Sequence, residues 1–552
     1  MFTMVDLPAR GIARFCILSL FTFFSYMGKT QVNEPTTNEV YGFIYRMAQK
    51  GMIEINDFIL PLDRMEIAKQ LLKIESNKST LSAKELQELF FYSKEYASDI
   101  VLNDSLSKIS LNGASILKYD KYNRARLVSV HNINTQLFVD PVLGGNISVY
   151  SGKQLSKQYF GGVRIYGYLS KNIGFNFLFR DITENGDSVD IAKTFTPAQG
   201  VINTSRYNNS LNYSNINFNL SYKWKNGMLS FSKENMQWGY GESGKIVLSN
   251  KAPSFLNINL TYDPFKWLNF SYFHGWLNSD VVDSNASYNT SNGYREVFIK
   301  KFIANHSLNF RVQKGLVFSI GESIVYSDKF DLGYLMPFNF FKAYDQYVSS
   351  YSLHGGSNGQ LFGQISSRNQ IKNLHAYLVI FVDEIRLDKI FSKTLSRNQI
   401  AYTLGVNKTD LLFKYLSAGL EYTRVRGGVY NNIITAQTYT NNSYVMGDWI
   451  GQNADRLYLY AKFTPFAKLK LNSWWQFIRK GRPYTIDEQY YQQPEPPFLN
   501  DKLFDQKQYG FSVLYEWLHS TKFFLSFSHT SFVYPSYSSS GSNLNLGFSY
   551  GL

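Results

Sequence analysis

The stretch INFNLSYKWKNGMLSFSKE, residues 216–234, decides the fold class. From Ile216 to Trp224, every second side chain is apolar or aromatic, and asparagine, serine and lysine stand between them. Asn226-Gly227 is the strongest short-range hairpin signal, and the same alternation continues after it. Because successive side chains of a strand point to opposite faces, the stretch predicts an antiparallel hairpin with one apolar face and one polar face.

The same period of two recurs along the chain, in IGFNFLFRD (173–181), WLNFSYFHGW (267–276) and the final LNLGFSYGL (544–552). Aromatic residues make up 17% of the sequence, with 44 Phe and 41 Tyr, which is typical of strands whose outer face meets lipid between aromatic girdles. After residue 30, no apolar run approaches the roughly 18 residues of a helical span. We therefore predict an all-β outer-membrane barrel of about 16–18 antiparallel strands. A soluble β-sandwich is the alternative, although such domains seldom exceed roughly 250 residues.

Composition divides the chain into three parts. Residues 1–30 contain two arginines before an apolar core and are predicted to be a secretory signal peptide. Residues 31–105 carry apolar positions at helical spacing, with Asp63 and Glu66, and Ser82 and Glu85, at capping-box distance, and predict a small helical periplasmic segment. Residues 106–552 form the predicted barrel. Its long polar stretches at 186–215, 279–295 and 482–506 fit external loops opposite short periplasmic turns.

One stretch resembles a nucleotide-binding loop. QWGYGESGKIVLSN, residues 237–250, contains Gly239 and Gly244-Lys245 at the spacing of G-x-x-x-x-G-K-[ST]. However, Ile246 stands where the magnesium-binding hydroxyl is required, and the residues that follow favour a strand rather than a helix. We interpret the segment either as a glycine-rich turn leading into a barrel strand or as a segment folded into the lumen.

Other chemistry finds little support. The only cysteine, Cys16, lies in the predicted signal peptide, so disulfides and thiolate chemistry are excluded from the remainder. No two histidines have the spacing of a zinc site, and we predict neither a metal nor a cofactor. The carboxylates in VDEIRLDKI (382–390) are interpreted as lumen-lining groups. The net charge of +14 on an exported chain favours acidic polysaccharide or anionic lipid, not nucleic acid.

Aromatic and basic residues gather in and after NSWWQFIRKGRPY (472–484). Aromatic rings stack on sugars, and arginine or lysine pairs with uronate or phosphate groups. The predicted polysaccharide-binding residues are Arg479, Lys480, Arg482, Tyr484, Tyr490 and Tyr491. The alternative is that Trp474 and Trp475 belong to an interface girdle followed by an ordinary charged strand end.

The glycine-rich stretch also carries a family resemblance. WGYGESGKIVLSNKAPSF, residues 238–255, resembles the signature of the Wzi capsule-assembly family, roughly W-G-P-G-x-x-G-S-L-I-L-S-N-N-A-x-P-F. The matching residues include Trp238, Gly239, Gly241, Ser249, Asn250 and Pro253, whereas Tyr240 replaces a proline and Lys251 an asparagine. Residues 61–72, 334–347 and 451–466 also look like family segments, the last two like its later barrel segments.

The resemblance implies an 18-stranded barrel with a periplasmic helical bundle, which holds capsular polysaccharide at the cell surface as a lectin, without enzymatic activity or cofactor. The expected partners are capsular or other surface polysaccharide, outer-membrane lipids and lipopolysaccharide, and the barrel-assembly machinery. Two alternatives stay open at this point. One is a porin or substrate-specific channel, and the other is an outer-membrane hydrolase or acyl-modifying enzyme.

Overall fold

The computed structural model describes residues 31–103, 113–119, 124–132, 135–202, 205–207, 209–351, 356–392 and 395–551. The predicted signal peptide, residues 1–30, and the predicted boundary between residues 105 and 106 lie outside these ranges. Within them, no helix is both long enough and apolar enough to cross a membrane.

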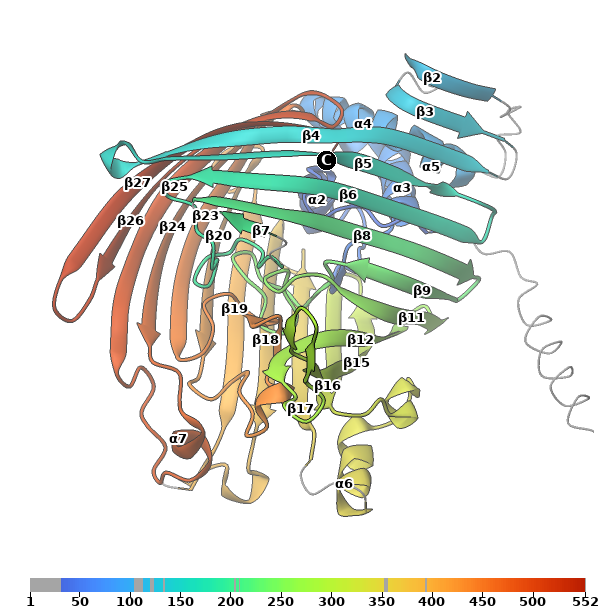
Figure 1. Ribbon diagram of the computed structural model, residues 1–552. Coiled ribbons are helices and arrows are strands. Elements are labelled where there is room, and N and C mark those ends of the chain that lie inside the picture. The colour runs from blue at the N-terminus through green and yellow to red at the C-terminus, as the bar shows by residue number, and fades with distance from the viewer. Residues whose placement is uncertain are drawn as a thin grey trace, which may run out of the picture.

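The main body is a closed antiparallel barrel (Figure 1). Across the described residues, its wall contains 18 strands, which lies within the predicted range of about 16–18. Each strand pairs with its neighbour in the chain, and the last one closes the ring on the first through pairs such as Leu546↔Ile147. The wall strands are β4 (Gln136–Tyr150), β5 (Leu155–Tyr168), β6 (Ile173–Gly186), β8 (Ser210–Trp224), β9 (Gly227–Glu234), β11 (Phe255–Phe265), β12 (Leu268–Val282), β15 (Phe298–Gln313), β16 (Leu316–Ser327), β17 (Asn358–Arg368), β18 (Leu374–Glu384), β19 (Gln399–Thr409), β20 (Leu416–Val425), β23 (Ala454–Phe466), β24 (Leu469–Gly481), β25 (Lys502–Leu518), β26 (Thr521–Val533) and β27 (Ser538–Tyr550).

The hairpin predicted for residues 216–234 forms β8 and β9, which pair from Trp224↔Gly227 to Phe218↔Lys233. Leu220 and Phe231, on its apolar face, are 48% and 42% exposed in the isolated chain, so this face points away from the lumen. Asn219 and Ser232, on the polar face, are buried. The apolar face therefore meets lipid and the polar face lines the interior.

Shorter elements decorate the wall. β2 (Gly113–Tyr119) and β3 (Ala125–His131) extend one end of β4, and β7 (Ser205–Tyr207) pairs with the start of β8. In the part of the chain that the structure describes, three two-stranded pairs lie outside the barrel sheet, namely β1 (Ile59–Leu60) with β10 (Gln237–Trp238), β13 (Tyr288–Thr290) with β14 (Gly293–Arg295), and β21 (Thr440–Asn441) with β22 (Tyr444–Val445).

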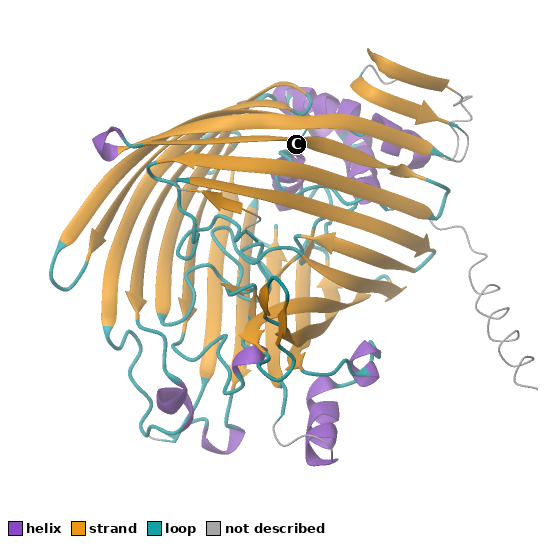
Figure 2. Cartoon of the chain, viewed as in Figure 1, coloured by secondary structure: helices purple, strands orange, loops and turns teal. Residues whose placement is uncertain are grey.

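Helices occur at both ends of the barrel (Figure 2). At one end lie α2 (Val40–Gln49), α3 (Arg64–Ser76), α4 (Ala83–Glu95) and α5 (Ala97–Asn103), together with the short turns between strands; we call this the turn end. The long connections, with α6 (Phe341–Tyr351) and α7 (Ile486–Tyr490), leave the opposite end, the loop end. The separation of long loops from short turns therefore agrees with the sequence.

The helical caps form largely as predicted. Ser82 and Glu85 make a complete capping box at the start of α4, whereas the Asp63 side chain caps α3 by accepting a hydrogen bond from the Met65 N–H. Helix α5 is an additional helix that neither of the two predicted capping pairs indicated.

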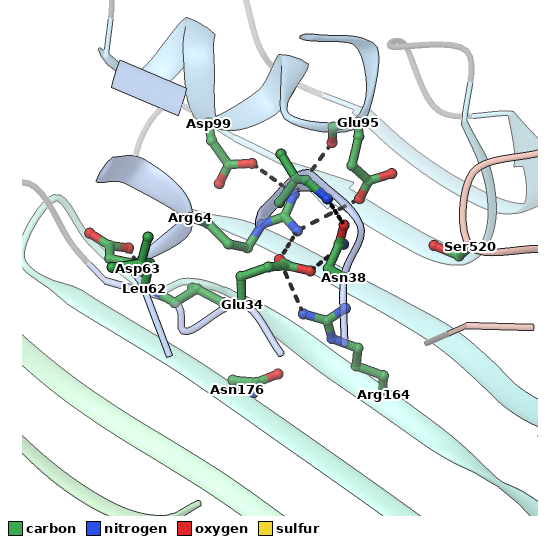
Figure 3. Close-up of polar contacts among 12 residues, drawn as sticks. Glu34, Asn38, Leu62, Asp63, Arg64, Glu95, Asp99, Arg164, Asn176 and Ser520 are labelled. Carbon is green, nitrogen blue, oxygen red and sulfur yellow. Dashed lines mark hydrogen bonds and ion pairs between the residues drawn. The ribbon is translucent and has the colours of Figure 1, made fainter. Parts of the chain in front are cut away.

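A buried arginine joins the helices to the barrel wall (Figure 3). The Arg64 side chain, at the start of α3, is 0% exposed, and its guanidinium contacts Glu34 Oε2 at 2.5 Å and Asp99 Oδ2 at 3.0 Å. Arg164 of β5 approaches the same Glu34 carboxylate at 3.6 Å. Burial tends to raise the pKa of Glu34, but the two guanidinium groups outweigh it and the pKa is lowered. The acidic side chains thus compensate a cation that would be very costly to bury alone.

The connection after β16, residues 328–351, covers part of the outer wall. Phe273, Ile303 and Val325 belong to the core inside the barrel, so the side chains at alternate positions along the same strands point outward. Several outward side chains are nevertheless buried against this connection, which includes Tyr334 and Phe341. The buried outward residues are Phe270, Tyr272, Phe302, Ala304, Ile324 and Tyr326. This connection replaces the barrel-like segment that the family resemblance suggested for residues 334–347, since it forms a short 3-10 turn and α6.

Candidate functional site

The glycine-rich stretch lies inside the barrel. Residues 235–254, which we call the luminal segment, connect the adjacent strands β9 and β11. The Trp238 ring packs against Phe273 of β12 and Phe362 of β17, with ring centroids 5.3 and 6.3 Å away. Because these residues come from well-separated strands, the segment reaches across the interior. Of the two interpretations given above, the segment folded into the lumen is the one observed. The strand expected after Lys245 is reduced to a single bridge between Trp238 and Leu248.

A second connection holds the luminal segment in place. Residues 426–453, between β20 and β23, supply Tyr430 and Tyr439, whose hydroxyls donate to the carbonyl oxygens of Ile246 and Val247, both at 2.8 Å. Ser249 donates through its N–H to the Met446 carbonyl at 2.7 Å. Ile246 and Val247 are fully buried, so their carbonyls need these partners.

The glycines of the signature permit a tight backbone. Gly239 has φ of +96°, a conformation that side chains disfavour. A Cβ on Gly241 would lie 1.8 Å from the Gly244 carbonyl oxygen, and one on Gly244 would lie 2.3 Å from Asp448 Oδ2. These positions therefore exclude any other residue for reasons of space or backbone conformation.

Lys245 stabilises the same loop, and this role does not require a bound phosphate. Its Nζ donates to the Gly239 carbonyl at 2.5 Å, and burial lowers its pKa. The lysine that suggested a nucleotide therefore caps the loop to which it belongs.

Charged side chains from the wall fix the same segment. Glu421 of β20 accepts hydrogen bonds from the Glu242 and Ser243 N–H groups at 2.6 and 3.2 Å. The Arg456 guanidinium of β23 binds both Asp448 carboxylate oxygens, at 2.9 and 2.8 Å, and all three charged side chains of this cluster are 0% exposed. We call Glu421, Asp448 and Arg456 the luminal ion cluster. The sequence analysis did not find it, because its members are separated from the signature by about 170–220 positions.

The other signature residues are divided between core and surface. Ser249 donates through its hydroxyl to the Gly447 carbonyl at 2.5 Å, and Pro253 is buried. Asn250, by contrast, is exposed. Most of the signature therefore has a structural explanation within the lumen.

A cavity of about 620 Å³ separates the luminal segment from α2. Several charged side chains in its lining are already paired, including Arg368 with Asp57, at 2.8 and 2.6 Å, and Lys462 with Glu242. No group of three or more His, Cys, Asp or Glu side chains in the described part of the chain is arranged to hold a metal ion.

The structure does not gather the six predicted polysaccharide-binding residues on one exposed face. Arg479 points outward from β24 and pairs with Asp455, whereas Lys480 points inward and donates to the carbonyls of Ile450 and Gln452 at 2.8 and 2.6 Å. Trp474 shares the inward face with Lys480, and Trp475 points outward as a girdle residue would.

The remaining four belong to the loop that contains α7. Arg482 pairs with Glu488 and Asp501 at 2.6 and 2.8 Å, and this contact holds the pKa of Glu488 at about 2. Tyr484 is buried, and its hydroxyl donates to the Pro496 carbonyl at 2.6 Å. Tyr490 is half-buried, and Tyr491 is 65% exposed. Of the six, Tyr491 is therefore the most open to a ligand, and the role of all six in binding stays a prediction.

Comparison with known proteins supports the fold and the family. Residues 201–471 match the family model described as capsule assembly protein Wzi. The Escherichia coli outer-membrane protein Wzi, a carbohydrate-binding β-barrel involved in group 1 capsule assembly, matches with a TM-score of 0.55 at 12% identity, over 95% of this chain and 100% of that chain. Pseudomonas aeruginosa OccK8 (OprE) and OpdK have TM-scores of 0.41 and 0.42 at 11% and 8% identity, each over 75% of this chain and 97% of the other. No curated protein matches the sequence significantly.

The fold defines this chain as an outer-membrane β-barrel protein. The resemblance to the Wzi family is confirmed over residues 201–471, which contain the luminal segment, the connection 426–453 and the whole luminal ion cluster.

Proposed function

We propose that the protein is a non-enzymatic outer-membrane barrel that binds exported capsular polysaccharide and keeps it at the cell surface. The observation that carries this proposal is the family match, because it falls on the segments that fill the lumen. The long connections at the loop end supply the external surface for a polymer, and the turn end with α2–α5 faces the periplasm.

A diffusion channel has less support. The luminal segment and residues 426–453 pack together in one apolar core with wall residues from β11 to β24, where a wide pore would need water. Such a core favours a plugged barrel. We therefore expect no steady open-pore conductance in planar bilayers.

The wider arrangement follows the same proposal. We assign residues 1–30 to the signal peptide, 31–105 to the helical periplasmic segment and 106–552 to the barrel. Outer-membrane lipids and lipopolysaccharide surround the apolar band, and the final strand β27, which closes the ring on β4, is the segment offered to the barrel-assembly machinery.

Deletion of the gene tests the function. We expect the same total polysaccharide but a larger fraction released into the medium, measured by separating cells from supernatant and assaying sugar in both. Complementation with the wild-type gene should restore retention. Unchanged retention in the deletion strain would refute the proposal.

A further inference from the structure

A second cavity, of about 260 Å³, lies against the barrel wall near the loop end. It is bounded by β5, β6 and β8 and by residues 198–202 of the connection after β6. Glu184 and Tyr213, in its lining, stand close to the ends of β6 and β8 that lead into this connection. The volume is slightly below the roughly 300 Å³ at which pockets for drug-sized ligands begin, so it suits a single sugar ring better than a chain segment.

The lining of this cavity is positively charged. It contains the cations Arg180, Lys193 and Lys233 and one carboxylate, Glu184, so its formal charge is 3 − 1 = +2. Lys193 Nζ pairs with Glu184 at 2.9 Å, and this pair neutralises the one negative charge that the described lining residues carry. Lys233 donates to two neutral groups, the Ile216 carbonyl at 2.9 Å and the Ser254 hydroxyl at 3.3 Å.

Among the described residues, Arg180 has no anionic partner. It points inward from β6, and no carboxylate of the described residues lies within ion-pair distance of its guanidinium. Its Nε is buried and has no hydrogen-bond partner among those residues. The ring centroid of Phe160 is 5.7 Å from the guanidinium carbon. Arg180 is half-buried, and a planar guanidinium binds a carboxylate through two parallel hydrogen bonds.

Neutral groups in the cavity complement this cation. Asn215 Oδ1 is a buried acceptor without a partner among the described residues, which suits a sugar hydroxyl. Phe160 and Tyr213 line the same space and offer apolar ring surface. Cation, acceptor and ring together match the chemistry of an acidic pyranose.

We propose that this cavity binds one acidic sugar residue of the exported polysaccharide, with its carboxylate on Arg180. The proposal rests on the proposed function, and it adds both the site and the class of sugar. It also assigns a function to part of the chain's net positive charge, namely the binding of an acidic ligand in this cavity.

The test uses polysaccharide extracted from the source cells, before and after chemical reduction of its carboxyl groups. Binding to the full-length protein in detergent is measured for wild type, Arg180→Gln and Lys266→Gln, the last being an exposed cation in the β11–β12 turn at the opposite end. Because charge-assisted hydrogen bonds are about twice as strong as neutral ones, we expect about a tenfold or greater loss of affinity for Arg180→Gln and for the reduced polymer, and none for Lys266→Gln. Arg180→Lys should recover part of the loss, and heat-modifiable migration on gels should confirm that each variant is folded.

The possible failures are distinguishable. If wild type and Arg180→Gln bind the polymer equally, or if the extracted polymer contains no acidic sugar, the cavity proposal is wrong while the proposed function stands. If lipopolysaccharide from an acapsular strain binds with the same dependence on Arg180 and the polymer does not, the cavity serves lipid and the proposal is overturned. If the wild-type protein retains no polysaccharide in any form, the proposed function itself falls.

Discussion

Replacing Asp448 by Asn should release the luminal segment from its main electrostatic support. The substitution keeps the side-chain volume but removes the charge that faces Arg456, with which Asp448 shares two hydrogen bonds of 2.9 and 2.8 Å. Both side chains are 0% exposed, and the next carboxylate, Glu421, lies 3.7 Å from the guanidinium. Breaking a fully buried pair costs about 3–5 kcal/mol, and the residual contact with Glu421 places the expected loss near the lower limit, about 3 kcal/mol.

The assay is urea unfolding of the barrel folded into lipid vesicles, with the free energy of unfolding extrapolated to water. Asp501→Asn is the matched control, since Asp501 is 59% exposed and its pair with Arg482 should contribute less than about 1 kcal/mol. Planar-bilayer recordings should also show that Asp448→Asn, unlike the control, gives transient conductance as the segment loosens. If the free energy of unfolding falls by the same small amount in both variants and neither variant conducts, the luminal ion cluster does not hold the luminal segment in place.

Three further outcomes follow from the described contacts. Gly241→Ala should destabilise the barrel by about 3 kcal/mol, because its Cβ meets a carbonyl oxygen at 1.8 Å, whereas Gly161→Ala, with nothing within 4 Å, should be near neutral; equal urea midpoints would contradict this. Burial raises the pKa of Asp63 from 3.8 to about 6, so the folded state holds a proton that the unfolded state loses. Stability should therefore fall by at most about 3 kcal/mol as the pH rises from about 4 to 6, and unfolding of Asp63→Asn should lack this slope while keeping the helix cap. Tyr491→Ala should weaken polysaccharide binding in a pulldown at unchanged stability, whereas Tyr484→Ala should lower stability; the reverse pattern would exclude Tyr491 from the binding surface.

The barrel and its helical caps were predictable because their signals are local. A lipid-facing strand repeats its pattern within ten residues, as Ile216 to Trp224 do, and a cap such as Ser82 with Glu85 spans a single turn. These local patterns do not depend on how the neighbouring elements are arranged.

The interior was not predictable, because its contacts join distant positions. Glu421 meets the backbone of Glu242 and Ser243 only after the barrel has closed, and nothing near position 421 in the sequence marks it as a partner. Distant contacts also explain the outcome for segment 334–347, which resembles later barrel segments of the family. Its apolar residues pack on the outer face of neighbouring strands, a position that the resemblance does not distinguish from membership in the wall.

The contacts of the N-terminal helices with the barrel wall limit the order in which the chain can fold. Arg46 donates to the Thr464 hydroxyl at 3.0 Å, Lys470 contacts Glu88 at 2.9 Å, and the Phe91 carbonyl lies 2.7 Å from a His519 ring nitrogen. These helices from the N-terminal part of the chain thus find partners on the strands nearest its C-terminus. Their own apolar side chains pack against one another in a core that runs from Val40 to Tyr96, so this core does not need the wall. Because contacts so remote in sequence form slowly, we expect the helical segment to dock on the barrel only after β23–β26 are in place.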